Sequence, residues 1–340
     1  MKALLPLLAG DIGGTKTRLA LYFIVQGELR LQRERTYPSA RYDSLESILG
    51  DFLAGDDPPS AACFGVAGPV ENGRCRTTNL PWLVDAAQLA ATLGIPDVAL
   101  LNDLEATALG LLHLPPQAFR GLQPGTDGAP GTMAVIAAGT GLGEAILYWD
   151  GFRHHALPTE GGHTDFAPND EWEDGLLAWL RHRLGGHVSY ERILSGPGLH
   201  TLYEYLREAE SAPESPDLRA RLEREDPAAV IAELGLSGQA SLCREALRRL
   251  ARIYGAEAGN LALKSLARGG VILAGGIAPK ILPALTDGTF LEGFLAKGRF
   301  RTLLEQLPVR IALDPAAPLL GAAAHAAEIS QRHRCHHSVT

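Results

Sequence analysis

The sequence predicts an α/β fold, and three observations support this prediction. Segments with the pattern of strands alternate with segments with the pattern of helices, which is typical of α/β domains. Apolar runs end in glycine-rich turns at three places, residues 10–16, 138–144 and 273–279. The chain has 340 residues, more than a usual single domain, so we expect two domains or one large α/β unit.

Periodicity predicts the elements of the N-terminal part in order. Leu7–Ala9 and Thr17–Phe23 have the pattern of two strands around the first glycine turn, and "SLESILGDFLAG" has the apolar spacing of an amphipathic helix with Gly55 as a stop signal. The segments "AACFGVAGPV" and "DVALL" predict further strands. Between these two strands, "DAAQLAATLG" predicts a short helix capped by Asp85.

The rest of the chain repeats part of this order. "TMAVIAAGTGLGEAILYW" is again a strand, a glycine turn and a strand, which suggests a duplicated architecture. The polar, proline-punctuated stretch 207–239 predicts a loop with surface helices. The longest helical pattern, "SLCREALRRLARIYGAEAGNLALKSLA", is expected to be interrupted near Gly255 and Gly259, and "GGVILAGGIAPK" predicts a buried strand that ends in a glycine turn.

Composition and charge argue against two classes of partner. Hydrophobic residues make up 46% and charged residues 21% of the chain, as in ordinary globular enzymes. The net charge of -8 argues against nucleic-acid binding, although a small phosphate compound needs only local N–H groups. No apolar stretch approaches the ~20 residues of a membrane span. Because Pro6 interrupts the oily N-terminal run, we expect a cytoplasmic protein rather than an exported one.

The cysteines predict neither a zinc site nor a disulfide framework. Cys63, Cys75, Cys243 and Cys335 are scattered without a C-x-x-C pair, so we expect reduced thiols. The C-terminal "QRHRCHHSVT" contains possible metal ligands, but we interpret it as a frayed terminus.

The glycine turns point to a phosphate ligand. Without Cβ atoms, backbone N–H groups can approach a phosphate closely. Each turn alone could be a tight hairpin, but three of them after apolar strands, two with a threonine, favour a nucleotide. The P-loop pattern is absent, and Glu144 stands where a dinucleotide fingerprint needs its third glycine.

A carboxylate stands where a strand gives way to a helix. In "LLNDLEATALG" the apolar run ends at Asn102 and Asp103. Both residue types favour the N-cap position of a helix, so the local sequence is equally compatible with a cap and with a functional acid.

Six segments together resemble the bacterial glucokinase family of the hexokinase/actin-like ATPase superfamily. They run in order from Gly10 to about Ala324, and the zinc motif of a sister group is absent. The segments are "GDIGGTKTRLAL", "LLNDLEATALG", "AAGTGLGEA", "PTEGGHTDFAP", "YERILSGPGL" and "GNLALKSLARGGVILAGGIAPK". The resemblance implies a two-domain hexokinase–actin-like (ribonuclease H-like) α/β fold with an interdomain cleft. It places a small domain at residues 1–112 plus about 315–330 and a large domain at 113–314. It also implies a homodimer.

The resemblance implies that ATP is held by two phosphate hairpins and an adenosine turn, with Mg²⁺ held through water by Asp11. The first hairpin comprises Asp11, Gly13, Gly14 and Thr15, the second Gly139, Thr140 and Gly141, and the adenosine turn Gly275 and Gly276.

The resemblance also implies a catalytic base and a set of sugar ligands. Asp103 matches the base that accepts the proton of the sugar's 6-hydroxyl as this oxygen attacks the γ-phosphate. The residues matched to the sugar's ring hydroxyls are Asn102, Glu160, His163 and Glu191, and more loosely Asn79 with Thr78. Carboxylates accept from hydroxyls, whereas Asn and His can donate or accept.

The function implied is ATP-dependent phosphorylation of D-glucose to glucose 6-phosphate, with glucose and ATP as the partners. Two alternatives stay open. One is a kinase for another hexose, such as mannose or fructose, because the four sugar contacts do not exclude the C2 epimer. The other is a sugar-sensing regulator that binds without turnover.

Overall fold

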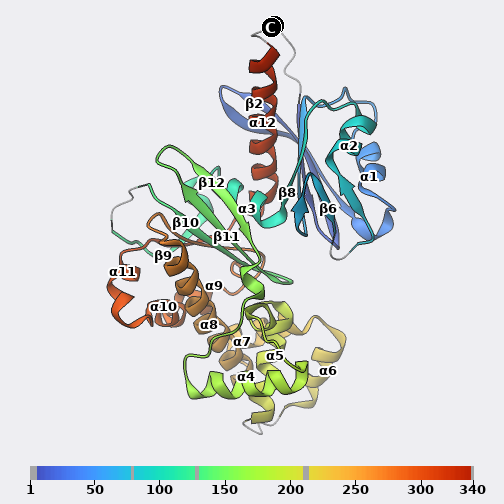
Figure 1. Cartoon of the computed structure of the whole chain (residues 1–340). Helices are drawn as coiled ribbons and strands as arrows, with labels where there is room; N and C mark the ends of the chain where they lie inside the picture. Colours follow the sequence, from blue (N-terminus) through green and yellow to red (C-terminus); the bar gives the residue numbers. More distant parts are fainter. Residues whose placement is uncertain (1–5, 78–79, 127–129, 210–213, 338–340) are drawn as a thin grey trace. The chain divides into compact units, whose positions relative to one another are not determined.

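The computed structural model describes residues 6–77, 80–126, 130–209 and 214–337, with side chains described up to residue 331 (Figure 1). The contacts within the chain divide it into two compact units. The first unit contains residues 1–116 and 314–340, and the second contains residues 117–313. Each unit is built on one main β-sheet.

The first unit contains a five-stranded sheet in the order β3-β2-β1-β4-β8. Strand β1 forms an antiparallel hairpin with β2, which pairs antiparallel with β3, whereas β1, β4 and β8 are mutually parallel neighbours. The strands are β1 (Leu7–Ile12), β2 (Lys16–Val25), β3 (Glu28–Pro38), β4 (Ala61–Val66) and β8 (Val98–Asn102). A second, three-stranded sheet contains β5 (Val70–Glu71), β6 (Arg74–Arg76) and β7 (Leu83–Asp85).

Helices cover both faces of the five-stranded sheet. Side chains of β1 alternate between two apolar clusters: Leu8 and Ile12 pack with α1 and α2, and Leu7 and Ala9 pack with α3 and α12. Because neighbouring residues of a strand point to opposite faces, burial of both faces requires the almost continuous apolar runs seen in the sequence. These helices are α1 (Leu45–Phe52), α2 (Ala86–Leu93), α3 (Asp103–Leu111) and α12 (Ala317–His337).

The C-terminal helix α12 packs tightly on α3. A Cβ atom added to Gly110 would clash with the carbonyl of Ala317, and one added to Gly321 would clash with the carbonyl of Ala106. The two glycines therefore let the helix backbones approach each other closely. The helix that begins at Asp103 is thus supported by the last helix of the chain.

The second unit contains a six-stranded sheet in the order β12-β11-β10-β13-β14-β9. Its centre repeats the first unit: β10 and β11 form an antiparallel hairpin, and β10 pairs in parallel with β13, as β13 does with β14. The strands are β9 (Phe119–Gln123), β10 (Met133–Ala138), β11 (Leu142–Trp149), β12 (His154–Thr159), β13 (Gly270–Ala274) and β14 (Val309–Ala312).

Helix α8, of 25 residues, lies at the centre of the helical part of the second unit (Figure 1). Our expectation of an interruption near Gly255 and Gly259 is wrong, because α8 runs without a break. A Cβ at Gly255 would clash with the carbonyl of Phe290, and one at Gly259 would lie 2.7 Å from the carbonyl oxygen of Phe294. The two glycines therefore serve close packing against α10, which offsets their low helix propensity. The helices are α4 (Glu171–Leu184), α5 (Gly196–Ala209), α6 (Pro216–Arg224), α7 (Pro227–Ser237), α8 (Ser241–Ser265), α9 (Leu282–Thr286), α10 (Thr289–Leu295) and α11 (Arg301–Glu305).

Most of the expected local elements are confirmed. Asp85 caps α2 by accepting from the N–H groups of Ala87 and Gln88. The polar stretch 207–239 contains α6 and α7, but Val230 and Ile231 are buried in the core, so α7 is more than a surface helix.

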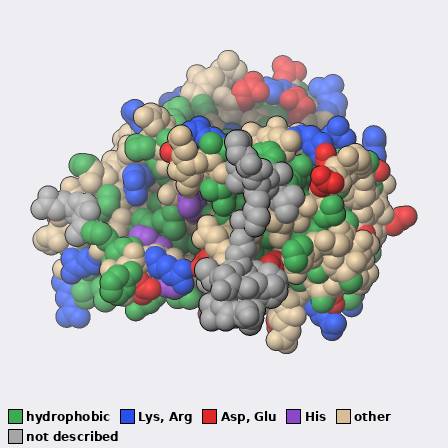
Figure 2. Space-filling view, turned by 90° about the horizontal axis from the view of Figure 1, so that it is seen from above, with side chains coloured by type: hydrophobic (Ala, Val, Ile, Leu, Met, Phe, Trp, Pro, Cys, Tyr) green, Lys and Arg blue, Asp and Glu red, His purple; other side chains and the backbone are tan. Residues whose placement is uncertain are grey.

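Charged side chains of both signs lie on the surface, and the described cysteines are not paired in disulfides. On the face drawn in Figure 2, Lys and Arg side chains are scattered among Asp and Glu. Cys63, Cys75 and Cys243 are buried free thiols, and the side chain of Cys335 lies outside the described residues. Within the described part of the chain, every helix is too short or too polar to cross a membrane.

Candidate active site

The first glycine turn connects β1 to β2 and is fixed by one serine. The N–H of Gly13 donates to the carbonyl of Lys16 at 3.0 Å, which closes the turn. Ser39 then holds it from the side: its N–H donates to the carbonyl of Thr15 at 3.1 Å, and its hydroxyl donates to the carbonyl of Gly13 at 2.8 Å. The tip is accessible, since Thr15 is exposed. A turn of this kind, rigid and open at its tip, can present N–H groups to a phosphate.

Two carboxylates of the first unit influence each other beside this turn. Burial raises the pKa of Asp11 to about 6, while the charge of Arg18 lowers it and the charges of Asp103 and Glu34 raise it further. The side chain of Asp11 is 27% exposed to solvent, and one of its carboxylate oxygens lies 4.0 Å from Arg18 Nη1. Arg18 is itself shared, because it donates to Glu34 at 2.9 Å. Asp11 therefore carries negative charge that its neighbours offset only in part.

The junction of β8 and α3 shows which of Asn102 and Asp103 caps the helix. Asn102 is the N-cap: its Oδ1 accepts from the N–H groups of Leu104 at 3.0 Å and Glu105 at 3.3 Å. Glu105 accepts in return from the N–H of Asn102 at 3.4 Å, which completes a capping box. Asp103 is the first helical residue and accepts from the N–H of Leu104 at 2.9 Å. The helix therefore does not need the Asp103 carboxylate as its N-cap.

A glycine brings this helix close to the sheet. Gly65 pairs with Asp11 across β4 and β1. A Cβ at Gly65 would lie 2.8 Å from the Cβ of Ala106 and 3.6 Å from the Cα of Asp103. Glycine at this position therefore allows the start of α3 to lie over the strand position beside Asp11.

In the second unit, two glycine turns lie side by side. The N–H of Gly139 donates to the carbonyl of Gly141 at 2.8 Å, and the carbonyl of Gly139 accepts from the N–H of Gly196 at 2.9 Å. Gly275 has a φ of +81°, and an added Cβ would clash with the carbonyl of Ala138, so a side chain is excluded for two reasons. The structure thus brings residues 139–141 and 275–276 together. Thr140 lies at the tip of its turn and is exposed.

Three of the predicted sugar ligands also meet in the second unit. His163 Nε2 lies 3.9 Å from Glu160 Oε2, and His163 Nδ1 lies 4.0 Å from Glu191 Oε1. Glu160 and His163 are exposed at 68% and 58%, whereas Glu191 is exposed at 29%. The three side chains therefore form an accessible polar cluster that could accept and donate hydrogen bonds to neighbouring hydroxyls.

Glu191 also contacts the second glycine turn. Its Oε2 accepts from the N–H of Leu142 at 3.0 Å. A Cβ added to Gly141 would clash with the same carboxylate. One predicted sugar ligand is therefore held by the backbone of a predicted phosphate hairpin.

The predicted residues thus fall into two groups. Asp11, Asp103 and Asn102 belong to the first unit with turn 13–15, and the remaining described sugar and nucleotide candidates belong to the second. Thr78 and Asn79 lie outside the described residues.

Sequence reasoning missed several residues that shape these groups. Arg18 and Ser39 carry no local signal, because their partners are brought close by the sheet. Glu144 has a signal: it is a buried acid in the otherwise apolar strand β11.

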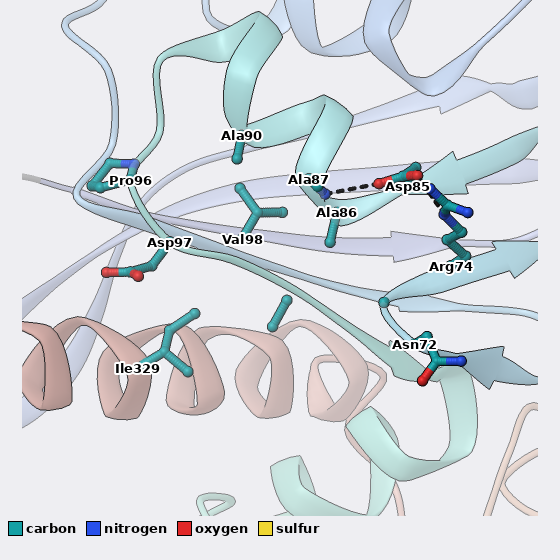
Figure 3. Close-up of a pocket in the computed structure, with 12 residues that line it drawn as sticks. Asn72, Arg74, Asp85, Ala86, Ala87, Ala90, Pro96, Asp97, Val98 and Ile329 are labelled. Atoms are coloured by element: carbon teal, nitrogen blue, oxygen red, sulfur yellow. Dashed lines mark hydrogen bonds and ion pairs between the residues drawn. The ribbon is translucent and has the colours of Figure 1, made fainter.

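Two surface pockets lie apart from the predicted reacting groups. One, of about 500 Å³, opens between α2, β8 and α12, with Asp85, Asp97 and Ile329 among the residues around it (Figure 3). The other, of about 410 Å³, is lined by residues that include Arg181 and His187. None of the predicted site residues lines either pocket.

Comparison with known proteins identifies the family. The glucokinase family model matches residues 8–329. The chain belongs to the glucokinase family. A curated glucokinase of Trichormus variabilis is 42% identical over 341 residues, which cover 95% of this chain and 99% of the relative.

Solved structures support the glucokinase fold. A glucokinase from an Antarctic psychrotroph has a TM-score of 0.82 at 30% identity, covering 95% of this chain and 99% of that chain. A ROK family glucokinase from Streptomyces griseus, solved with glucose and AMPPNP, has a TM-score of 0.63 at 20% identity, covering 95% of this chain and 99% of that chain. The latter likeness concerns the fold alone. The predicted resemblance and the α/β two-domain actin-like fold class are confirmed.

Proposed function

We propose that this glucokinase-family chain transfers the γ-phosphoryl group of ATP to the 6-hydroxyl of D-glucose, giving glucose 6-phosphate and ADP. The observation that supports this most is the junction at the start of α3. Asn102 is the N-cap with Glu105 as its capping-box partner, so the helix does not depend on the neighbouring carboxylate of Asp103 for its cap. The family supplies the substrate class, because the 42% identical relative is a glucokinase.

In the proposed mechanism, Asp103 is the general base. It would accept the proton of the 6-hydroxyl while that oxygen forms its bond to phosphorus and the bond from phosphorus to the ADP oxygen breaks. Phosphoryl transfer depends mainly on alignment and charge neutralisation. We therefore expect Asp103 to orient the hydroxyl as much as to deprotonate it. Its place at the first turn of a helix backed by α12 keeps the carboxylate fixed.

The sugar would be held by the polar cluster of the second unit together with Asn102 and Asn79. Glu160 and Glu191 would accept from ring hydroxyls, and His163 would donate or accept between them. Such a set discriminates between epimers, because a misplaced hydroxyl leaves polar groups of the site without partners once the sugar is bound.

ATP and Mg²⁺ fit the glycine turns and Asp11. Turns 13–15, 139–141 and 275–276 would hold the phosphates and the adenosine. Mg²⁺ retains several waters and is usually held by one or two carboxylates and by phosphates. Asp11 suits this role because its charge is only partly offset. When bound, Mg²⁺ would neutralise charge on the transferred phosphoryl group.

The remaining expectations are proposals of the same kind. The two compact units would be the small and large domains, and the cytoplasm would be the compartment. We expect a homodimer, which light scattering coupled to size-exclusion chromatography would test.

The function is tested by steady-state phosphorylation of a hexose panel with Mg-ATP. ADP release is coupled to a dye or NADH readout for glucose, mannose, fructose and galactose. The proposal expects the highest kcat/KM for glucose. A preference for mannose or fructose would replace the substrate and keep the kinase, whereas no ADP release with any hexose would favour a sugar-binding regulator.

A further inference from the structure

The second unit contains a buried carboxyl group that the proposed mechanism does not use. Glu144 lies in β11, three residues after Gly141, and is 2% exposed. Its Oε1 is buried without a hydrogen-bond partner among the described residues. An ionised carboxylate in such a place would be costly, so its protonation state needs an explanation.

The explanation is a second carboxyl group, that of Glu257 on α8, which is 0% exposed. One oxygen of Glu257 accepts from Asn260 Nδ2 at 2.8 Å and the other from Lys264 Nζ at 3.4 Å. Both oxygens of Glu257 thus accept from a donor on the same helix. Glu144 lies within hydrogen-bond reach of Glu257, and burial, followed by the charge of Glu257, raises the pKa of Glu144 well above its usual range. A proton shared between the two acids gives the buried carboxyl of Glu144 a hydrogen-bond partner.

Glu144 directly supports the turn that carries two sugar ligands. A Cβ added to Gly161 would clash with the Glu144 carboxyl. The hydroxyl of Thr159 donates to the carbonyl of Glu144 at 2.8 Å and accepts from the N–H of Gly161 at 3.1 Å. The side chain and the backbone of Glu144 therefore both contact the turn 160–163.

We propose that Glu144 is a positioning residue for the sugar: as a neutral acid it keeps its proton and donates a hydrogen bond to Glu257, and the resulting pair fixes the turn that presents Glu160 and His163. This inference rests on the proposed function. If Glu144 lost its proton, two buried carboxylates would repel each other. The displaced group would push against Gly161, which has no room beside it.

Other charged or titratable groups face this pair. Lys264 on α8 forms an ion pair with Glu257, and its charge lowers the pKa of Glu144. Tyr190 hydrogen-bonds to Asn260, and Tyr254 on α8 contacts the end of β10. Lys297 interacts electrostatically with Glu257 and with Glu173 on α4, and burial lowers the pKa of Lys297. A pH profile must therefore be compared with a variant changed only at Glu144.

The experiment measures glucose binding by calorimetry without nucleotide, from about pH 7 to about pH 9.5, in the full chain and in Glu144→Gln. Glutamine keeps the shape and stays neutral. For the wild type we expect the Kd for glucose to rise by about tenfold or more over this range. For Glu144→Gln we expect the wild-type Kd at about pH 7 and a change below about twofold at higher pH.

The matched control is Glu214→Gln. Glu214 is a similarly buried carboxyl of the same unit, 2% exposed in its side chain, but it pairs with Arg219 and Tyr203 instead of the turn. This variant should keep the wild-type pH profile. Glu144→Ala should raise the KM for glucose more than the KM for ATP, and a thermal melt shows whether it is folded.

The outcomes separate the two proposals. An alkaline loss of affinity that persists in Glu144→Gln, or a flat wild-type profile, would overturn the positioning role even if glucose is phosphorylated. A wild-type chain that neither binds nor phosphorylates glucose would overturn the proposed function itself.

Discussion

The two units share one strand order but differ in what they place at the strand ends. The orders β3-β2-β1-β4-β8 and β12-β11-β10-β13-β14 have the same pattern of antiparallel and parallel neighbours. In both units the glycine turn joins the central strand to its antiparallel partner. In the first unit the paired residues next to this turn include Asp11 and Arg18, whereas in the second the corresponding pair is Ala137 and Gly143.

The difference shows how one scaffold can serve two tasks. In the first unit, β8 leads straight into the helix that carries Asp103, so charged groups lie on regular elements. In the second unit, the polar candidates lie on short turns after β12 and before α5, where they are accessible. We infer that the first unit supplies the reacting charges together with Asn102, Asn79 and turn 13–15, and that the second supplies the remaining groups that would hold substrate.

The largest effect is expected from the first unit. Asp103→Asn removes the proposed base while retaining its size, so kcat should fall by about 10²–10⁴ with a small change in the KM for glucose. Coupled steady-state kinetics measure both. Asp85→Asn is a suitable control, because Asp85 also stands between a strand and a helix of this unit but caps α2. Near-wild-type kcat in Asp103→Asn would exclude Asp103 as the base.

The sequence predicted the parts of this comparison that depend on local patterns. Strand alternation and glycine placement predicted both hairpins, and the Asp85 cap followed from residue type and position. These features are local, because each depends on neighbours within a few residues. The residue pattern could not decide whether Asn102 or Asp103 caps α3, since both suit that position.

What the sequence could not predict depends on contacts between distant segments. Glycines in α8 signalled a break, but packing against α10 outweighs a propensity cost of only ~1 kcal/mol per glycine. Glu144 and Glu257 are far apart in the sequence, and their proximity follows from the packing of α8 against β10, the strand beside β11. The hydrogen bonds from Ser39 to the first glycine turn likewise could not be predicted, because the folded sheet brings Ser39 next to Gly13 and Thr15.

The second effect tests whether Glu191 connects the sugar cluster to the second glycine turn. Gly141→Ala places a methyl group against the Glu191 carboxylate. Because a shift of this carboxylate misplaces a sugar ligand, the KM for glucose should rise by about 10–100-fold. In Gly139→Ala the added methyl group meets no atom within 4 Å, so any loss should appear in the KM for ATP. Equal effects of both variants on the KM for glucose would contradict the connection.

A smaller effect concerns the stability of the second unit. In Gly255→Ala the methyl group meets the Phe290 carbonyl, so overpacking should lower the free energy of unfolding by about 1–3 kcal/mol. This loss should exceed the ~1 kcal/mol that alanine gains in helix propensity. Urea unfolding followed by circular dichroism measures the difference. A stabilised variant would show that α8 and α10 do not pack closely at this position.

The smallest expected effect is an increase in the free energy of unfolding, caused by a substitution in the first unit. Gly50 is a residue of α1 with no atom within 4 Å of an added Cβ. Gly50→Ala therefore gains helix propensity without a clash, and we expect about 0.5–1 kcal/mol of stabilisation. If the two units unfold in separate urea transitions, this variant should move one transition upward and Gly255→Ala should move the other downward. A shift of both transitions by either variant would mean that the stabilities of the two units are coupled, since each methyl group acts within its own unit.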